Sequence, residues 1–190
     1  MQATAFWKAF QSAMRKNIDS AKKAWPYNKD YTDFIVKMLE EMLGKEGEGY
    51  EISREYYRID LTAWVQKRQR VAAQVPTNAA YRFQPYLWDL EIAVEHENND
   101  KLWMDEVIKL AHICCALRVV IGYVPSGVQK TPYLAYVADA IAGSLNENAR
   151  KNMENGAFLL ILGNSKAEEK ERCVYTPYIW KNGAFTPLQI

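Results

Sequence analysis

Cysteine and histidine are scarce in this sequence, which has three cysteines and two histidines among 190 residues. Cys114 and Cys115 are neighbours in an apolar run, and Cys173 lies far along the chain. An odd number of cysteines, without the spacing of a disulfide framework or of a Cys/His zinc site, argues against both. We therefore expect a packed core to hold the fold together, with neither a disulfide nor structural zinc.

Long apolar runs and a strong net charge are also missing. No segment approaches the roughly 20 apolar residues that span a bilayer. The start, Met1–Lys8, lacks the basic stretch and apolar run of a secretory leader. We expect no membrane partner, and cytoplasm is the default location. The formal net charge is only +1, so a nucleic-acid partner would require a local basic surface.

Motifs for nucleotide binding and covalent catalysis are absent as well. The sequence has no Gly-rich phosphate loop of the Walker or Rossmann type, and no Ser-His-Asp or Cys-His arrangement in a recognisable local context. These absences leave acidic side chains as the main carriers of chemistry.

What the sequence does contain is the pattern of one α/β domain over residues 1–190. Apolar residues make up 49% and charged residues 25%, which is typical of a globular domain. Periodicity predicts helices at about 3–24, 30–43, 101–117 and 132–152, and strands at about 50–52, 56–64, 86–97, 119–124 and 158–162, followed by a terminal hairpin around Asn182-Gly183. This order predicts a three-layer α/β/α fold with a mixed sheet and helices on both faces.

Acidic residues stand out on two of these strands. Glu95 and Glu97 are two residues apart, so their carboxylates share one face of a strand about 7 Å apart. Two such carboxylates repel unless positive charge lies near, and a divalent cation is a natural partner. Asp60 becomes a third acid if the two strands pair. The structural alternatives are a solvated strand face for the glutamates and a salt bridge from Asp60 to Arg58 or Arg82.

These residues resemble the motif of the PD-(D/E)xK nuclease superfamily, which has an acid on the second strand of a meander and acid-x-Lys on the third. The segment 58–61, Arg-Ile-Asp-Leu, is similar to the first half without the preceding proline, and 95–97, Glu-His-Glu, is similar to the second half with glutamate in place of lysine. The family order of helix, three-stranded meander, helix and strand covers about residues 30–125. The resemblance implies a restriction-endonuclease-like core with an extra N-terminal helix and the C-terminal hairpin.

The activity implied by this resemblance is Mg²⁺-dependent hydrolysis of phosphodiester bonds in DNA. Asp60 and Glu95 would hold Mg²⁺ or Mn²⁺, with Glu41 on the first core helix and the main-chain carbonyl of His96 as further ligands. Glu97 would orient or deprotonate the attacking water. The His96 side chain is expected in the core. Members of the family often dimerise, so the resemblance also implies a possible homodimer.

The missing motif lysine leaves three hypotheses open. An active enzyme would either use Glu97 at that position, which is similar to the variant in some active type II restriction enzymes, or replace the lysine with Lys109 or Lys101 on the following helix. Alternatively, the chain is a catalytically inactive nuclease-fold protein that binds nucleic acid or protein. In a third case it is an unrelated α/β domain, and Asp60 and Glu95 do not meet.

A local basic surface is the remaining expectation from the sequence. Its candidate phosphate contacts are Lys67, Arg68, Arg70, Arg82 and Lys101. The alternative for such a run is a solvated loop.

Overall fold

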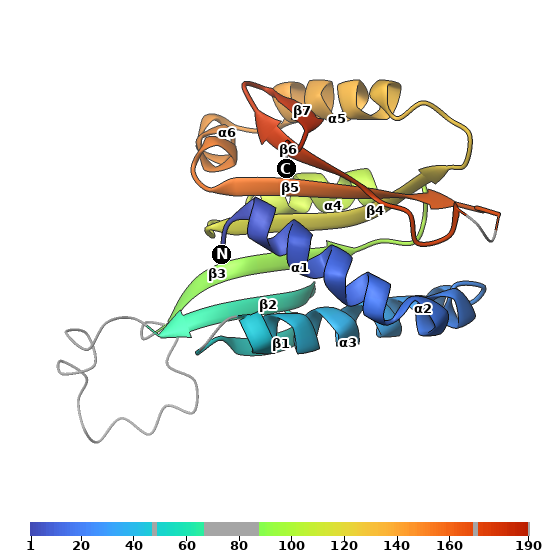
Figure 1. The fold of residues 1–190 in the computed structure, drawn as a ribbon. Helices are drawn as coiled ribbons and strands as arrows, with labels where there is room; N and C mark the ends of the chain where they lie inside the picture. Colours follow the sequence, from blue (N-terminus) through green and yellow to red (C-terminus); the bar gives the residue numbers. More distant parts are fainter. Residues whose placement is uncertain (47–48, 67–87, 169–170, 190) are drawn as a thin grey trace, which may run out of the picture.

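The computed structural model describes residues 1–46, 49–66, 88–168 and 171–189. Within them, seven strands form one sheet and six helices cover it (Figure 1). The helices are α1 (Ala3–Lys16), α2 (Ile18–Ala24), α3 (Asn28–Glu46), α4 (Trp103–Ala111), α5 (Thr131–Ser144) and α6 (Glu147–Glu154). The strands are β1 (Glu51–Tyr56), β2 (Ile59–Gln66), β3 (Trp88–His96), β4 (Leu117–Pro125), β5 (Ala157–Ser165), β6 (Thr176–Lys181) and β7 (Ala184–Pro187).

The sheet is mixed, and its strands lie in chain order from β1 to β7. The first three strands form an antiparallel meander, β3, β4 and β5 are parallel, and β6 and β7 return antiparallel. Parallel neighbours need a crossover connection, which α4 supplies between β3 and β4, and α5 with α6 between β4 and β5. The expected mixed-sheet α/β fold is confirmed.

Two helical layers enclose this sheet. Helices α1, α2 and α3 share a core with one face, and α4, α5 and α6 share a second core with the other (Figure 1). Strand β4 is buried from Leu117 to Val124, because both layers cover it. Among the described residues, no helix has the length and apolar character required to cross a membrane.

The predicted strand at 56–64 is wrong at its start. Tyr56 pairs with Ile59, so Tyr57 and Arg58 form a two-residue turn, and the preceding strand extends from Glu51 to Tyr56. Aromatic residues at 56 and 57 favour a strand locally, but hairpin pairing places them at its end. The predicted C-terminal hairpin is confirmed, with Asn182 and Gly183 between β6 and β7.

Three predicted helices are shorter or divided. The first breaks at Asn17, whose side-chain amide donates to the Ala13 carbonyl at 2.9 Å and competes with helical bonding. The helix predicted over 132–152 divides before Asn146, which accepts a hydrogen bond from the Ala149 N–H at 2.9 Å and caps α6. Helix α4 ends at Ala111, so the segment to residue 116 connects it to β4.

Candidate functional site

Two acids predicted to share a site lie on the paired strands β2 and β3. The register pairs Leu61 with Val94, so the next position along puts Asp60 beside Glu95 on the opposite face, toward α4. Side chains directly opposite in an antiparallel pair have Cβ atoms roughly 5 Å apart. The two acids therefore meet in space, in contrast to the expectation for an unrelated α/β domain.

Helix α4 brings a lysine to the same point. The Nζ atom of Lys109 lies 2.7 Å from Oε1 of Glu95, and it also forms an ion pair with Glu106 one turn earlier. It donates a hydrogen bond to the Arg58 carbonyl at 3.1 Å. Of the two lysines proposed to replace the motif lysine, Lys109 lies at the acids.

An open pocket of about 450 Å³ surrounds this cluster. It is lined by Glu55, Arg58, Asp60, Glu95, His96, Glu97, Glu106 and Lys109. Five of these lining side chains are carboxylic acids and two are cations, so the pocket has an excess of negative charge at neutral pH if all acids ionise. An excess of this kind favours either proton uptake or a bound cation.

Glu95 is the buried acid of this cluster, and its side chain is only 4% exposed. Its pKa is raised from 4.5 to about 8, chiefly by burial. The nearby Asp60 and Glu106 contribute to this rise, and Lys109 opposes it. Oε1 of Glu95 is buried and has the ion pair to Lys109 but no hydrogen bond of good geometry among the described residues.

Asp60 is fixed by the main chain of the neighbouring strand. Its Oδ2 accepts a hydrogen bond from the His96 N–H at 2.8 Å. Burial raises the pKa of Asp60, and the His96 N–H partly offsets this. No described arginine forms an ion pair with Asp60, and Arg82, one of the two partners considered, lies outside the described residues.

The His96 imidazole lies in the other core, as expected. Its Nε2 is 2.9 Å from the Tyr123 hydroxyl, and its ring is close to Tyr31. Burial lowers the pKa of the imidazole to about 3, so the ring is neutral at physiological pH. The contribution of His96 to the site is its main chain, which holds Asp60.

A divalent cation can be tested against this donor set. In residues 1–46, 49–66, 88–168 and 171–189, no group of three or more His, Cys, Asp or Glu side chains is arranged to hold a metal ion. Mg²⁺ usually keeps several waters and takes only one or two protein carboxylates plus substrate phosphates. Asp60 and Glu95 supply the two carboxylates of that smaller requirement, and Oε1 of Glu95 already contacts a cation, the Lys109 ammonium.

Several predicted site residues lie elsewhere or face away. Glu41 is exposed and lines a separate hollow between α1 and α3, with Ala13 and Lys16, so the structure does not bring it to the acids. Glu97 lies on the rim, where its Oε1 accepts from the Asn99 N–H at 2.6 Å.

The expected basic surface is only partly within the described chain. Lys67, Arg68, Arg70 and Arg82 fall at 67–87, outside the described residues. Lys101 is exposed in the turn before α4 and is not among the residues that line the pocket.

Two site acids and an arginine were not proposed as functional from the sequence. Glu106 precedes Lys109 by three residues on α4, a spacing that puts both on one helix face and would have indicated the pair. Glu55 and Arg58 reach the pocket through the β1–β2 turn, which the predicted strand boundaries concealed.

The chain has no match among the known proteins compared with it: no protein-family model, no curated protein and no solved structure matches it. A functional proposal therefore depends on the geometry of this site and on the motif resemblance in the sequence.

Proposed function

We propose that this chain is a Mg²⁺- or Mn²⁺-dependent nuclease that hydrolyses phosphodiester bonds of DNA. The observation that supports it most is the convergence of Asp60, Glu95 and Lys109 in one open pocket. Two acids on adjacent strands and one lysine are the groups of the PD-(D/E)xK motif, with the lysine supplied by the following helix. The element order from α3 to β4 is also that of the family core.

Each residue has a role that follows from its position. Asp60 and Glu95 would hold the cation, and the His96 N–H keeps the Asp60 carboxylate oriented. A bound Mg²⁺ polarises the phosphate and lowers the pKa of a coordinated water. The Lys109 ammonium would stabilise negative charge on the phosphate.

Glu106 and the Arg58 carbonyl hold that ammonium at the pocket. They direct it toward Glu95, while Glu97 is engaged by its own loop through the Asn99 N–H. Lys109 is therefore better placed than Glu97 for the role of the motif lysine.

The first test is a calorimetric titration of Mn²⁺ into the wild type, Asp60→Asn and Glu95→Gln, with a plasmid-nicking assay on the same samples. We expect metal binding and nicking in the wild type and loss of both in the two variants. Glu41→Gln removes an acid on the opposite face and should behave as the wild type. Metal binding without nicking would favour the inactive binding module, and absence of both would remove the metal site.

A second test concerns the lysine. Lys109→Ala should reduce nicking by about a hundredfold or more, the scale seen when one charge-stabilising donor is lost. Lys101→Ala, eight residues earlier and outside the pocket, should retain wild-type nicking. Equal losses in both variants, or none in either, would contradict the assignment of Lys109.

A further inference from the structure

The turn between β1 and β2 has a backbone that its residues disfavour. Tyr57 and Arg58 have φ values of 51° and 62°, in the left-handed region where a Cβ atom is costly. Two-residue hairpin turns of this kind usually carry Asn-Gly. The β6–β7 turn follows that rule, with Asn182 at 53° and Gly183 at 80°. The side chains at 57 and 58 are therefore not explained by turn formation.

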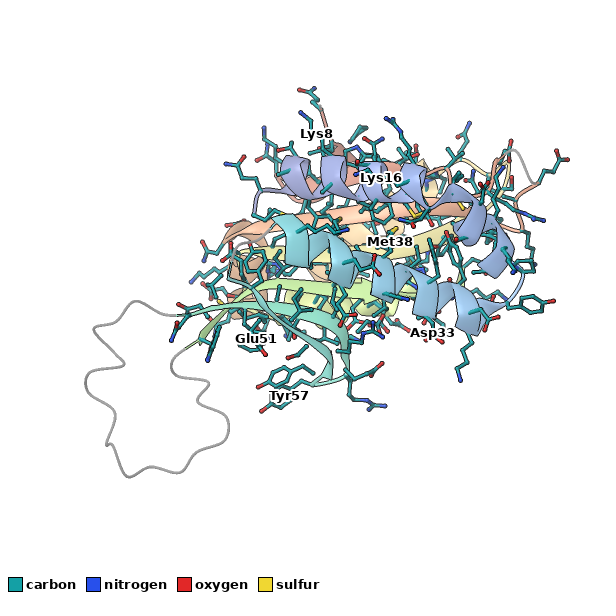
Figure 2. All side chains as sticks on the ribbon, turned by 60° about the horizontal axis from the view of Figure 1, so that its bottom comes forward. Lys8, Lys16, Asp33, Met38, Glu51 and Tyr57 are labelled. Carbon is teal, nitrogen blue, oxygen red and sulfur yellow. The ribbon has the colours of Figure 1, made fainter. Side chains whose placement is uncertain are left out.

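Tyr57 is also the most exposed of the large apolar side chains described, at 80%. Its ring makes an edge contact with Tyr56, with centroids 4.6 Å apart. Figure 2 shows Tyr57 projecting from the end of the hairpin, away from the helices that carry Met38 and Lys16. A single exposed aromatic residue is common on proteins, so the place of this one matters more than its exposure.

That place is next to the candidate active site in the chain, between the pocket residues Glu55 and Arg58. The neighbouring Arg58 lines the pocket, and its carbonyl accepts the hydrogen bond from Lys109. Lys109 in turn lies 2.7 Å from Glu95. The turn is thus tied to the proposed catalytic lysine: Arg58 is an exposed residue of the pocket lining, and Tyr57 precedes it in the chain.

We propose that Tyr57 stacks on an unpaired base beside the scissile phosphate while Arg58 contacts a phosphate of the same strand. The substrate of the pocket is then single-stranded or locally unpaired nucleic acid. This inference rests on the proposed nuclease function and adds the substrate class to it.

The physical reason is access to the base. An aromatic ring can stack only on a base face that is not already covered, and single strands offer such faces whereas the interior of a duplex does not. The pocket is rich in carboxylates, which repel a phosphate backbone. Arg58 supplies positive charge where a strand must pass them.

The test is fluorescence anisotropy with a short labelled oligothymidine and with the matching blunt duplex, measured both in EDTA and with Ca²⁺. We expect the wild type to prefer the single strand. Tyr57→Ala should weaken single-strand binding by about 5- to 100-fold, the range for one stacked base, and leave duplex binding unchanged. Tyr57→Phe keeps the ring and should bind within about twofold of the wild type.

The matched control is Tyr136→Ala, which removes a tyrosine that is 63% exposed on α5. Equal affinity for single strand and duplex, or equal effects of Tyr57→Ala and Tyr136→Ala, would overturn the inference. A Tyr57-dependent preference for single strands without Mg²⁺-dependent cleavage would keep the stacking site and overturn the nuclease function. Mg²⁺-dependent cleavage of single strands that Tyr57→Ala leaves unchanged would keep the nuclease function and overturn the role of Tyr57.

Discussion

Glu95 shows how one buried acid depends on its neighbours. A buried carboxylate is costly unless it is paired or bound to a cation. Glu95 has one cation close by, Lys109, and that lysine is shared with Glu106. Burial lowers the pKa of Lys109, but its two glutamate partners outweigh burial, and the pKa is raised overall. Lys109 therefore remains charged at neutral pH, whereas the protonation of Glu95 depends on pH.

The stability of the protein should consequently depend on pH through Glu95. Because folding raises its pKa from 4.5 to about 8, the folded state binds the extra proton between these values. The contribution of Glu95 to stability is then fully present below 4.5 and is lost as pH rises through about 8. Glu95→Gln resembles the protonated form and lacks this loss. Its unfolding free energy relative to the wild type should increase by a few kcal/mol from about pH 5 to about pH 9.

Urea denaturation of both proteins across this range measures the difference. Glu41→Gln, at an exposed acid, serves as the control and should follow the wild-type pH profile. Wild-type and Glu95→Gln curves that stay parallel with pH would contradict the raised pKa. Mg²⁺ that binds Glu95 should flatten the wild-type fall, because the cation favours the ionised carboxylate.

At the residue scale the sequence predicted the central acids but not their environment. Strand periodicity put Glu95 on the face opposite His96, and in the structure Glu95 contacts Lys109 of α4 while the His96 ring contacts Tyr123 in the other core. Glu41 was assigned by analogy with a helix position, and the helix presents it to α1 instead. Periodicity defines faces within an element, whereas contacts between elements depend on how they pack.

At the element scale, the β1–β2 hairpin combines a costly turn with the exposed side chains that we propose to contact nucleic acid. Left-handed non-glycine residues cost on the order of 1 kcal/mol each. Such a cost persists where the surrounding structure holds the turn in place, as strand pairing and the Lys109 hydrogen bond do here. Stability and function are then opposed at this turn.

Replacing Tyr57-Arg58 by Asn-Gly, the pair favoured in such turns, should raise stability and weaken nucleic-acid binding. The double variant Tyr57→Asn/Arg58→Gly is expected to stabilise the protein by about 1 kcal/mol, which raises Tm by roughly 2–4 °C. It should also lose the single-strand preference. Gly183→Ala at the other hairpin is the opposite control, because it places a Cβ at φ 80° and should lower Tm. A Tm of the double variant at or below wild type would contradict this account.

Helices and strands were predictable where the local sequence pattern and the tertiary contacts favour the same structure. The buried strands β4 and β5 and the Asn-Gly hairpin follow directly from composition. The break at Asn17 and the cap at Asn146 have local sequence signals, because asparagine favours helix ends. A prediction that follows only the hydrophobic stripe misses them. The Tyr57-Arg58 turn has none, because its residues favour a strand and only pairing across β1 and β2 imposes the turn.

At the scale of the whole molecule, α4 is positioned by a close approach to β4. A Cβ added to Gly122 would lie 2.6 Å from the Trp103 side chain, which is fully buried. Real Cβ contacts are not this short, so the helix can sit at its present depth only because residue 122 has no side chain. Lys109 is on the same helix, so this contact also sets how α4 presents the lysine to Glu95.

Gly122→Ala should therefore affect both stability and activity. Overpacking of this kind typically costs 1–3 kcal/mol, and the shift of α4 should reduce nicking if Lys109 acts there. Gly143→Ala on α5 is the matched control, since a Cβ there meets nothing within 4 Å and should be neutral or stabilising by up to about 1 kcal/mol. Thermal unfolding and plasmid nicking of the two variants make the comparison. Equal Tm values would contradict the packing constraint.

The sequence by itself determined the α/β class, the buried parallel strands, the C-terminal hairpin and the strand face that carries Glu95. These follow from periodicity and turn chemistry, which act between residues close in the chain. The tertiary structure alone brings Asp60 to Glu95, Lys109 to the same pocket, and Arg58, next to the exposed Tyr57, into the pocket lining. Those relations join different strands and a helix, from 14 residues apart for Glu95 and Lys109 to 51 for Arg58 and Lys109. They depend on strand register and on the depth at which α4 packs.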